Sequence, residues 1–261
     1  ETRFAPLYRE FLQSLLQYLL TFLVFGIVFY KGFRIIDNAE KKRRLELSYL
    51  SRHDDLTGLL NRNGLLDRLD NLVPDRKPFC LIVINIDNFK GINDRFGLET
   101  GDETLLEFGR RLAELVESRD DLAQLGGDEY AIVTPNTNLD DVEKACVSLA
   151  GNLSRTFEVG RLRLQVTASI GVACFPNDGD SLSKLIRSAH LALYEAKQSR
   201  NDVCIYRSEM EMAYLRRLSV EQRLRYGLAS GSLYMVYQPQ VDQTGKAVGL
   251  EALVRWQDEE L

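Results

Sequence analysis

The stretch Phe79 to Ile86, FCLIVINI, restricts the fold of this chain more than any other. A nearly unbroken apolar run of this length is typical of a β-strand that is buried on both faces. Such a strand must be covered on two sides, so the run predicts a sheet that lies between helices. Its far end turns polar at Asn85 and Asp87, and we expect an amide and a carboxylate to emerge where the strand leaves the core.

Helical and strand patterns alternate around this run. Apolar residues recur at helical spacing in Gly101 to Val116, Val142 to Leu153 and Leu182 to Ala196. Apolar and polar residues alternate in Leu162 to Ala173, and Val203 to Tyr206 has the length of a short strand. This order predicts an α+β fold, an α/β sandwich with one main sheet.

A β-hairpin with acidic residues at its tip is predicted at Gln124 to Val133, QLGGDEYAIV. Gly126 and Gly127 tolerate positive φ and let a ligand approach the backbone closely. Asp128 and Glu129 follow at once, and adjacent carboxylates suit hard cations such as Mg²⁺. These residues alone are equally compatible with an ordinary surface turn whose acids are solvated.

Composition excludes several classes of function. The formal net charge of −5 gives no general attraction to nucleic acid, so we expect no nucleic-acid partner. The four cysteines are far apart in the sequence and only two histidines are present, which argues against a zinc site or a disulfide framework and for reduced thiols. We expect His53 and His190 to serve helix packing or the surface. The chain begins without Met and stops inside an unfinished pattern, as a fragment would.

A transmembrane helix is predicted within residues 1–31. Phe11 to Tyr30 has no charged residue, and about 20 apolar residues cross one bilayer. Basic residues from Lys31 to Arg44 follow it, so the positive-inside rule predicts an inner-membrane protein whose later domains are cytoplasmic. The alternative is a buried helix of a larger sensor domain.

Residues 32–51 are predicted to form a linker helix. Ile36, Leu47 and Leu50 make a sparse apolar stripe among many charged residues. Such a helix could pair with a copy of itself and carry a signal to the domain that follows. A solvated helix that only spaces the domain from the membrane explains the pattern equally well.

Four motifs, in order, resemble the GGDEF family of diguanylate cyclases. They are DDLTGLLNR at Asp54 to Arg62, IDNFKGINDRFG at Ile86 to Gly97, GD at 101–102 and GGDEY at Gly126 to Tyr130. The resemblance implies a GGDEF domain over residues 52–207 with a palm-like nucleotide-cyclase fold, whose central, mainly antiparallel sheet is flanked by helices. It also implies GTP as substrate, Mg²⁺ or Mn²⁺ as cofactor, and dimers that join two GTP molecules into cyclic di-GMP.

The resemblance also implies roles for single residues. Asp128 matches a metal-binding acid, and Glu129 matches a residue implicated in handling metal and the 3′-hydroxyl. Asn93 and Asp102 match the pair that recognises guanine, since a carboxylate accepts hydrogen bonds from N1 and N2 and an amide can bond to O6 or N3. The remaining matches assign GTP contacts to Lys90, Lys197, Gly126 and Gly127, and metal contacts to Asn85 and Ile86.

Several positions depart from the family pattern. Asn85 stands where the family has a second metal-binding carboxylate, so one negative charge is missing, and whether Asp87 can replace it stays open. The family's FGHxxGD reads FGLETGD here, and AKxxGRN is one residue short at AKQSRN. The inhibitory RxxD site reads ESRD at 117–120 and lacks its first arginine. These changes concern metal and phosphate contacts, and they predict weak cyclase activity or none with GTP binding retained.

Residues 208–261 resemble the start of an EAL domain, the family of cyclic di-GMP phosphodiesterases. A charged helix from Glu211 precedes the motifs YQPQVD and GLEALVRW. By resemblance, Gln238 and Arg255 contact the dinucleotide and Glu251 binds metal. The later ligands of that family lie beyond Leu261, so residues 1–261 alone should not hydrolyse the dinucleotide by that route.

Together these observations predict a membrane-anchored bacterial signalling protein of cyclic di-GMP metabolism, homodimeric through the linker helix and the GGDEF domain. Its cyclase-type domain is followed by a truncated phosphodiesterase-type domain. Two alternatives stay open. One is a non-enzymatic receptor that binds GTP and cyclic di-GMP and signals to a partner protein, and the other is a structural dimerisation module.

Overall fold

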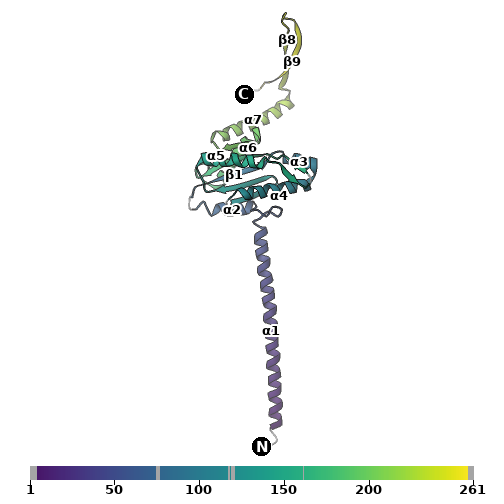
Figure 1. Ribbon diagram of the computed structural model, residues 1–261, viewed down its shortest axis with the longest axis vertical. Helices are drawn as coiled ribbons and strands as arrows, with labels where there is room; N and C mark the ends of the chain where they lie inside the picture. The colour runs from purple at the N-terminus through teal and green to yellow at the C-terminus, as the bar shows by residue number, and fades with distance from the viewer. Residues whose placement is uncertain (1–4, 75–76, 117, 119–120, 161, 258–261) are drawn as a thin grey trace.

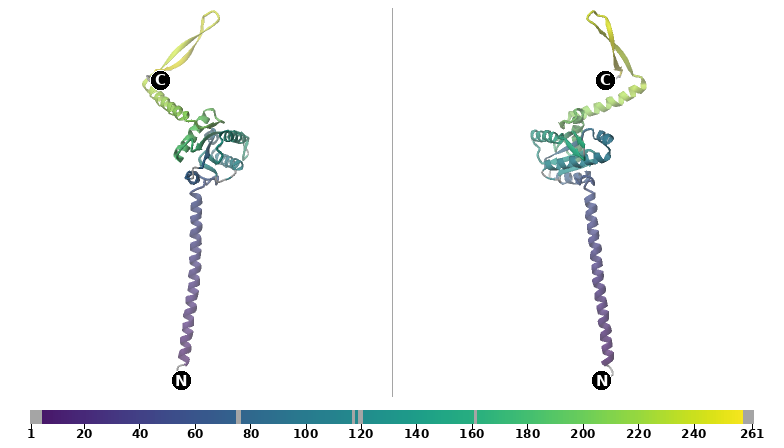
Figure 2. Two further views of the ribbon diagram at one scale, coloured as in Figure 1. Left: turned by 90° about the vertical axis from the view of Figure 1, so that its left-hand side faces the viewer. Right: turned by 45° about the vertical axis from the view of Figure 1, so that its right-hand side comes forward.

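The computed structural model describes residues 5–74, 77–116, 118, 121–160 and 162–257. An α/β body lies between two extended parts of the chain (Figures 1 and 2). Helix α1 (Ala5–Leu50) projects from one side of the body. Helix α7 (Glu209–Ser230) and the hairpin of β8 (Leu233–Val241) and β9 (Ala247–Trp256) stand on the opposite side.

The body is built on a five-stranded sheet with the order β2-β3-β1-β6-β7. Strand β1 (Phe79–Ile86) is central and buried along its whole length, as its apolar run predicts. It pairs antiparallel with β3 (Glu129–Thr134) and with β6 (Ala168–Phe175). The edge strands are β2 (Leu122–Gly126), antiparallel to β3, and β7 (Val203–Ile205), parallel to β6. The predicted palm-like α+β fold with a mainly antiparallel sheet is therefore confirmed.

Helices cover both faces of this sheet. Alternate residues of β1 point to opposite faces, so Ile82 and Ile84 pack in one core cluster and Leu81 and Val83 in the other. The first cluster includes side chains of α4 (Leu98–Leu115) and α5 (Leu139–Leu153). The second includes side chains of α2 (Arg62–Asp70) and α6 (Leu182–Ser199).

Two elements differ from the sequence-based expectation. The single strand expected at Leu162 to Ala173 is split into β5 (Leu162–Leu164), which pairs with β4 (Phe157–Val159), and β6. Helix α3 (Phe89–Phe96) was not expected, because it is short and follows β1 after only two residues. It matters for function, since it holds residues that the resemblance assigned to GTP.

A disulfide joins Cys80 and Cys174. The two residues are direct partners in the β1–β6 register, although 94 positions separate them in the sequence. The expectation of reduced cysteines is wrong for this pair, because sequence spacing does not reveal a partner across two strands. Cys146 and Cys204 are free thiols.

The predicted membrane span is wrong, and the predicted inner-membrane localisation falls with it. Residues 1–31 and 32–51 are not separate helices, since α1 runs without a break from Ala5 to Leu50. Among the described helices, none contains a stretch apolar enough and long enough to span a bilayer. Polar residues such as Gln17 between the leucines lower the mean hydropathy of the stretch.

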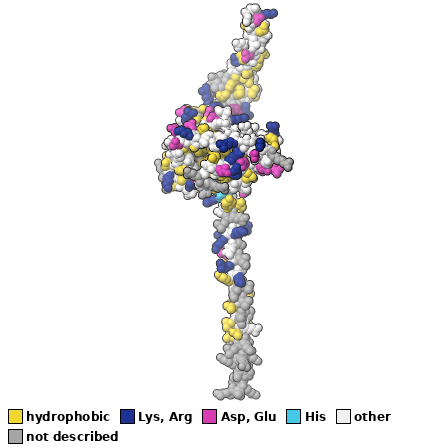
Figure 3. Space-filling model, viewed as in Figure 1, with side chains coloured by type: hydrophobic (Ala, Val, Ile, Leu, Met, Phe, Trp, Pro, Cys, Tyr) yellow, Lys and Arg dark blue, Asp and Glu magenta, His cyan; other side chains and the backbone are white. Residues whose placement is uncertain are grey.

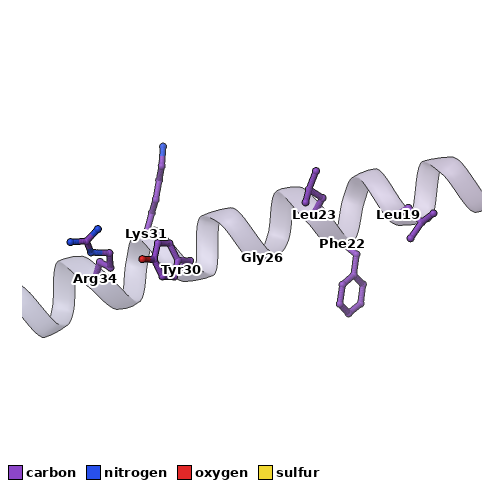
Figure 4. A pocket seen from close by; sticks show the side chains of 7 residues that line it. All are labelled: Leu19, Phe22, Leu23, Gly26, Tyr30, Lys31 and Arg34. Carbon is purple, nitrogen blue, oxygen red and sulfur yellow. The ribbon is translucent and has the colours of Figure 1, made fainter.

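Apolar side chains nevertheless stand exposed along α1, with cationic ones nearer the body (Figure 3). Phe22 is 84% exposed. A close view shows its side chain and those of its neighbours pointing away from the helix axis in several directions (Figure 4). A shallow surface along this part of α1 is lined by Leu19, Phe22, Leu23, Gly26, Tyr30, Lys31 and Arg34. The pairing of α1 with a second copy stays a prediction.

Candidate functional site at the glycine hairpin

The glycine hairpin has the predicted form and an open tip. Gly126 pairs with Glu129, so Gly127 and Asp128 make the turn between β2 and β3. Gly126 has φ 130° and Gly127 has φ 56°, values that favour glycine. No atom lies within 4 Å of where a Cβ would stand on either glycine. The backbone of the turn is therefore free to be approached by a ligand.

Buried side chains hold the hairpin from below. The Gln124 side-chain amide donates to the Gly127 carbonyl at 2.9 Å, and its oxygen accepts from the Thr57 hydroxyl at 2.7 Å. The Tyr130 hydroxyl donates to the Leu105 carbonyl of α4 at 2.8 Å. Burial raises the pKa of Tyr130, so the phenol stays protonated and keeps this donor.

The structure brings the polar end of β1 directly against this hairpin. Asn85 is the register partner of Glu129, and the Ile86 amide donates to the Asp128 carbonyl at 3.0 Å. The Asn85 side chain is nearly buried, with 6% of its surface exposed. The Ile86 side chain packs in the core, so only main-chain atoms of Ile86 can face a ligand.

Asp87 cannot replace the missing charge at position 85 without losing structural hydrogen bonds. Its carboxylate accepts from the Thr167 hydroxyl at 2.7 Å, the Ser169 hydroxyl at 2.7 Å and the Asn201 amide at 2.9 Å. These bonds tie the end of β1 to the start of β6 and to the turn after α6. These bonds favour a structural role for Asp87, and its replacement of the missing metal ligand stays an untested alternative.

His190 of α6 contacts the hairpin, which the sequence did not indicate. Its Nε2 lies 2.5 Å from Glu129 Oε1, and its Nδ1 lies 2.8 Å from the Ile186 carbonyl oxygen. The hydrogen bond that His190 donates to the Glu129 carboxylate raises the pKa of His190 above its usual range. The one signal in the sequence was that His190 precedes Lys197 by seven residues, which places both on one side of α6.

The residues matched to guanine recognition lie on adjoining helices. Asn93 is on α3 and Asp102 is on α4. The Asn93 Oδ1 atom is buried and has no hydrogen-bond partner among the described residues. It lies so close to Gly101 that a Cβ at that position would overlap it. Asp102, the residue that follows Gly101, has an exposed side chain. An orphaned acceptor next to an exposed carboxylate suits a ligand rich in N–H donors.

The two lysines matched to phosphate contacts are both exposed. Lys90 lies in the first turns of α3 and Lys197 in the last turn of α6. Neither forms an ion pair with another described residue. Helix α6 ends at Ser199 and is followed by Arg200 and Asn201, whose φ values of 57° and 46° are rare for residues other than glycine. The Asn201 bond to Asp87 holds this turn in place.

The residues matched to the EAL family gather on one face of the β8–β9 hairpin. Gln238 pairs directly with Glu251, and Arg255 is four residues further along β9 on the same face. All three are exposed. The Arg255 guanidinium donates to the Val254 carbonyl at 3.0 Å.

A family model described as "Diguanylate cyclase, GGDEF domain" matches residues 51–202, more than half of the chain. The chain belongs to the GGDEF family. The curated relatives include the bifunctional diguanylate cyclase/cyclic di-GMP phosphodiesterase MucR of Pseudomonas aeruginosa, 34% identical over 218 residues, which are 81% of this chain and 32% of that protein. The cyclic di-GMP phosphodiesterase PdeR of Escherichia coli is 32% identical over 228 residues, 86% of this chain and 34% of that protein.

A solved structure supports the assignment. The coiled coil and GGDEF domain of DgcB from Caulobacter crescentus, in complex with c-di-GMP, is 25% identical with a TM-score of 0.56. The match covers 66% of this chain and 97% of that one. The chain spans about a third of the length of the two curated relatives. Its GGDEF domain therefore has its relatives among bacterial cyclic di-GMP signalling proteins.

The residues around this GGDEF hairpin do not assemble the acid cluster that a resident pair of cations would require. No group of three or more histidines, cysteines, aspartates or glutamates close enough to hold a metal occurs in the part of the chain that the structure describes. Asn85 is neutral, Asp87 is held by three hydrogen bonds and Glu129 is held by His190. Asp128 is the acid of this end that no described side chain engages, and it does not fit a two-cation site by itself.

Positions 117, 119 and 120 of the ESRD sequence lie outside the described residues.

Proposed function

We propose that this chain acts in bacterial cyclic di-GMP signalling as a GTP-binding GGDEF domain with weak diguanylate cyclase activity or none. The observation that carries the proposal is the orphaned Asn93 carbonyl beside the exposed Asp102. A buried acceptor without a partner costs free energy, about 1–3 kcal/mol, which a guanine donor would restore. Lys90 and Lys197 are exposed cations that suit the phosphates.

Weak cyclase activity is expected because of the side chains at positions 85 and 129, where a cation would need negative charge. Attack of a 3′-hydroxyl on an α-phosphate builds up negative charge, which phosphoryl-transfer sites offset with cations. Here Asn85 is neutral and Glu129 is bonded to His190, so two of the acidic positions at the hairpin are not available to a cation. Weak turnover with retained nucleotide binding is the expected result.

The chain's arrangement supports a division into an N-terminal helix, a GGDEF domain at 52–207 and the beginning of an EAL-type domain at 208–261. Gln238, Glu251 and Arg255 lie on one face of the β8–β9 hairpin. This placement agrees with a surface that binds a dinucleotide and a cation when the rest of such a domain is present. We propose cyclic di-GMP as the ligand of that domain, and a homodimer formed through α1 and the GGDEF domain.

A non-enzymatic receptor is the second candidate function, and the His190–Glu129 contact favours it over full catalysis. In that case GTP on the GGDEF domain and cyclic di-GMP on the EAL-type domain would signal to a partner protein. If a complete set of acidic EAL ligands followed residue 261, that would favour the enzyme.

Calorimetry with GTP and ATP tests nucleotide binding, and incubation with radiolabelled GTP tests turnover. We expect GTP to bind at least tenfold more tightly than ATP, and cyclic di-GMP to form slowly or not at all. Robust product formation would contradict the weak-cyclase proposal, and equal affinity for the two nucleotides would contradict guanine recognition. Asn85→Asp tests whether the missing charge limits turnover, and Asp94→Asn, an exposed acid of α3, serves as its control.

A further inference from the structure

The His190 contact fixes where the protons of the imidazole are. A carbonyl oxygen only accepts hydrogen bonds, so the 2.8 Å contact with the Ile186 carbonyl requires a proton on Nδ1. The 2.5 Å contact between Nε2 and Glu129 Oε1 then needs one further proton between these two atoms. If that proton stays on Nε2, the pair is an imidazolium and a carboxylate. If it stays on Oε1, the pair is a neutral imidazole and a carboxylic acid.

The net charge of the His190–Glu129 pair is zero in both arrangements, so Glu129 contributes no net negative charge to the end of the hairpin. Glu129 faces Asn85 across the β1–β3 ladder, and Asn85 is also neutral. Asp128 is then the net negative group at the hairpin tip, and Asp87, one residue beyond β1, keeps its negative charge while its oxygens accept three hydrogen bonds from neutral donors. Arg62 of α2 adds positive potential at His190. At the hairpin tip a divalent cation therefore meets one carboxylate, Asp128, that is neither neutralised by His190 nor held by the hydrogen bonds that engage Asp87, whereas the GGDEY sequence alone suggests two.

We propose that His190 is an internal counter-charge and positioning residue for Glu129, and that it takes the place beside this carboxylate that a divalent cation would otherwise take. The imidazole holds Glu129 on the α6 side of the hairpin. Lys90 and Lys197, which are exposed and unpaired among the described residues, then supply the charge that offsets nucleotide phosphates. It follows that GTP binds with little dependence on Mg²⁺. The Mg²⁺-independent binding of GTP rests on the proposed function. The counter-charge role of His190 does not.

Direct Mn²⁺ binding, measured by electron paramagnetic resonance on the full chain without nucleotide, tests the counter-charge. His190→Ala removes the imidazole, and His190→Gln keeps a donor to Glu129 but brings no neutralising proton. We expect both variants to bind Mn²⁺ about tenfold more tightly than the unmodified chain, because a carboxylate charge is released and affinity rises with ligand charge. Asn85→Asp combined with His190→Gln should gain about a further tenfold. His190→Lys, which keeps a cation, should gain nothing.

Arg217→Gln is the matched control, because it also removes the cationic partner of a carboxylate. Arg217 of α7 pairs with Glu195 of α6, the helix that also carries His190, at 3.0 Å. Its replacement should leave Mn²⁺ affinity unchanged. A gain in His190→Ala but not in His190→Gln would overturn the counter-charge role and leave only a steric one. No gain in either variant, with circular dichroism unchanged, would overturn the proposal entirely.

GTP calorimetry in Mg²⁺ and in EDTA tests the second step. We expect the affinity of the unmodified chain to change less than threefold between the two buffers. A fall of more than tenfold in EDTA would overturn Mg²⁺-independent binding. If GTP binds in neither buffer, the proposed function fails, while the Mn²⁺ measurements on the His190 variants still decide whether the counter-charge exists.

Discussion

The two ends of the candidate site treat their polar groups in opposite ways. At the α3–α4 end, the Asn93 carbonyl is buried without a partner and Asp102 is exposed. At the β1–β3 end, Glu129 is bonded to His190, and nearby Asp87 accepts three hydrogen bonds. Unsatisfied polar groups indicate a place kept for a ligand, and satisfied ones indicate structure. A family motif can therefore be complete in the sequence although acidic side chains in and beside it already have hydrogen-bond partners within the protein.

The largest effect on GTP affinity is expected from a variant that displaces the Asn93 carbonyl at the α3–α4 end but replaces none of the polar side chains there. In Gly101→Ala the added Cβ would overlap Asn93 Oδ1, so the carbonyl must move. We expect GTP affinity to fall about 100-fold while the fold is kept, since alanine is the better helix residue by about 1 kcal/mol. Calorimetry measures the loss. Gly151→Ala in α5, where nothing lies within 4 Å of the new Cβ, should leave affinity unchanged.

A smaller loss is expected when the exposed carboxylate of the same end becomes neutral. Asp102→Asn keeps the shape and removes a charged acceptor, which contributes about 1.5–3 kcal/mol to a hydrogen bond. GTP affinity should therefore fall at least tenfold, with ATP affinity unaffected. Asp94→Asn is again the matched control. If both nucleotides weaken equally, Asp102 does not recognise the base.

At the β1–β3 end the expected effects are on stability. Asp87→Asn weakens the hydrogen bonds to Thr167, Ser169 and Asn201, and we expect a loss of about 1–2 kcal/mol in the free energy of unfolding. Hydrogen exchange should rise at the Asn201 amide. Urea denaturation measures the loss, with the exposed Asp180→Asn as control. An unchanged midpoint would show that Asp87 is available to a ligand after all.

The smallest expected effect concerns the bond that joins the two ends. Tyr130→Phe removes the hydroxyl that donates to the Leu105 carbonyl, and we expect a loss of about 1 kcal/mol. Thermal unfolding should show a lower Tm, and GTP affinity should fall less than fivefold. The exposed Tyr226→Phe should change neither.

Most of the fold could be predicted from the sequence, because its elements have strong local signals. The apolar run Phe79 to Ile86 is β1 residue for residue. The glycine hairpin is also where the pattern indicates. The single strand expected at Leu162 to Ala173 was wrong, because alternation continues through a turn that only tertiary pairing reveals.

The site could be predicted only in part, because its partners come from distant segments. The resemblance placed Asn93 and Asp102, and register then placed Asn85 opposite Glu129. His190 was expected to be a packing or surface residue, since its contact with Glu129 spans 61 positions. The disulfide between Cys80 and Cys174 was not predicted for the same reason, since 94 positions separate the two residues. The membrane span was wrong for another reason, since the length of a neutral stretch says little when polar residues lower its hydropathy.

The Tyr130 hydroxyl also sets a fixed span within the molecule. It joins the strand that starts at Glu129 to the helix that carries Asp102, three residues before Leu105. The buried, protonated phenol of Tyr130 thereby holds the α3–α4 end and the β1–β3 end of the site at one separation. On the proposed function, a nucleotide that contacts both ends has to match this separation, so we expect the length of a ligand as well as its charge to affect its affinity.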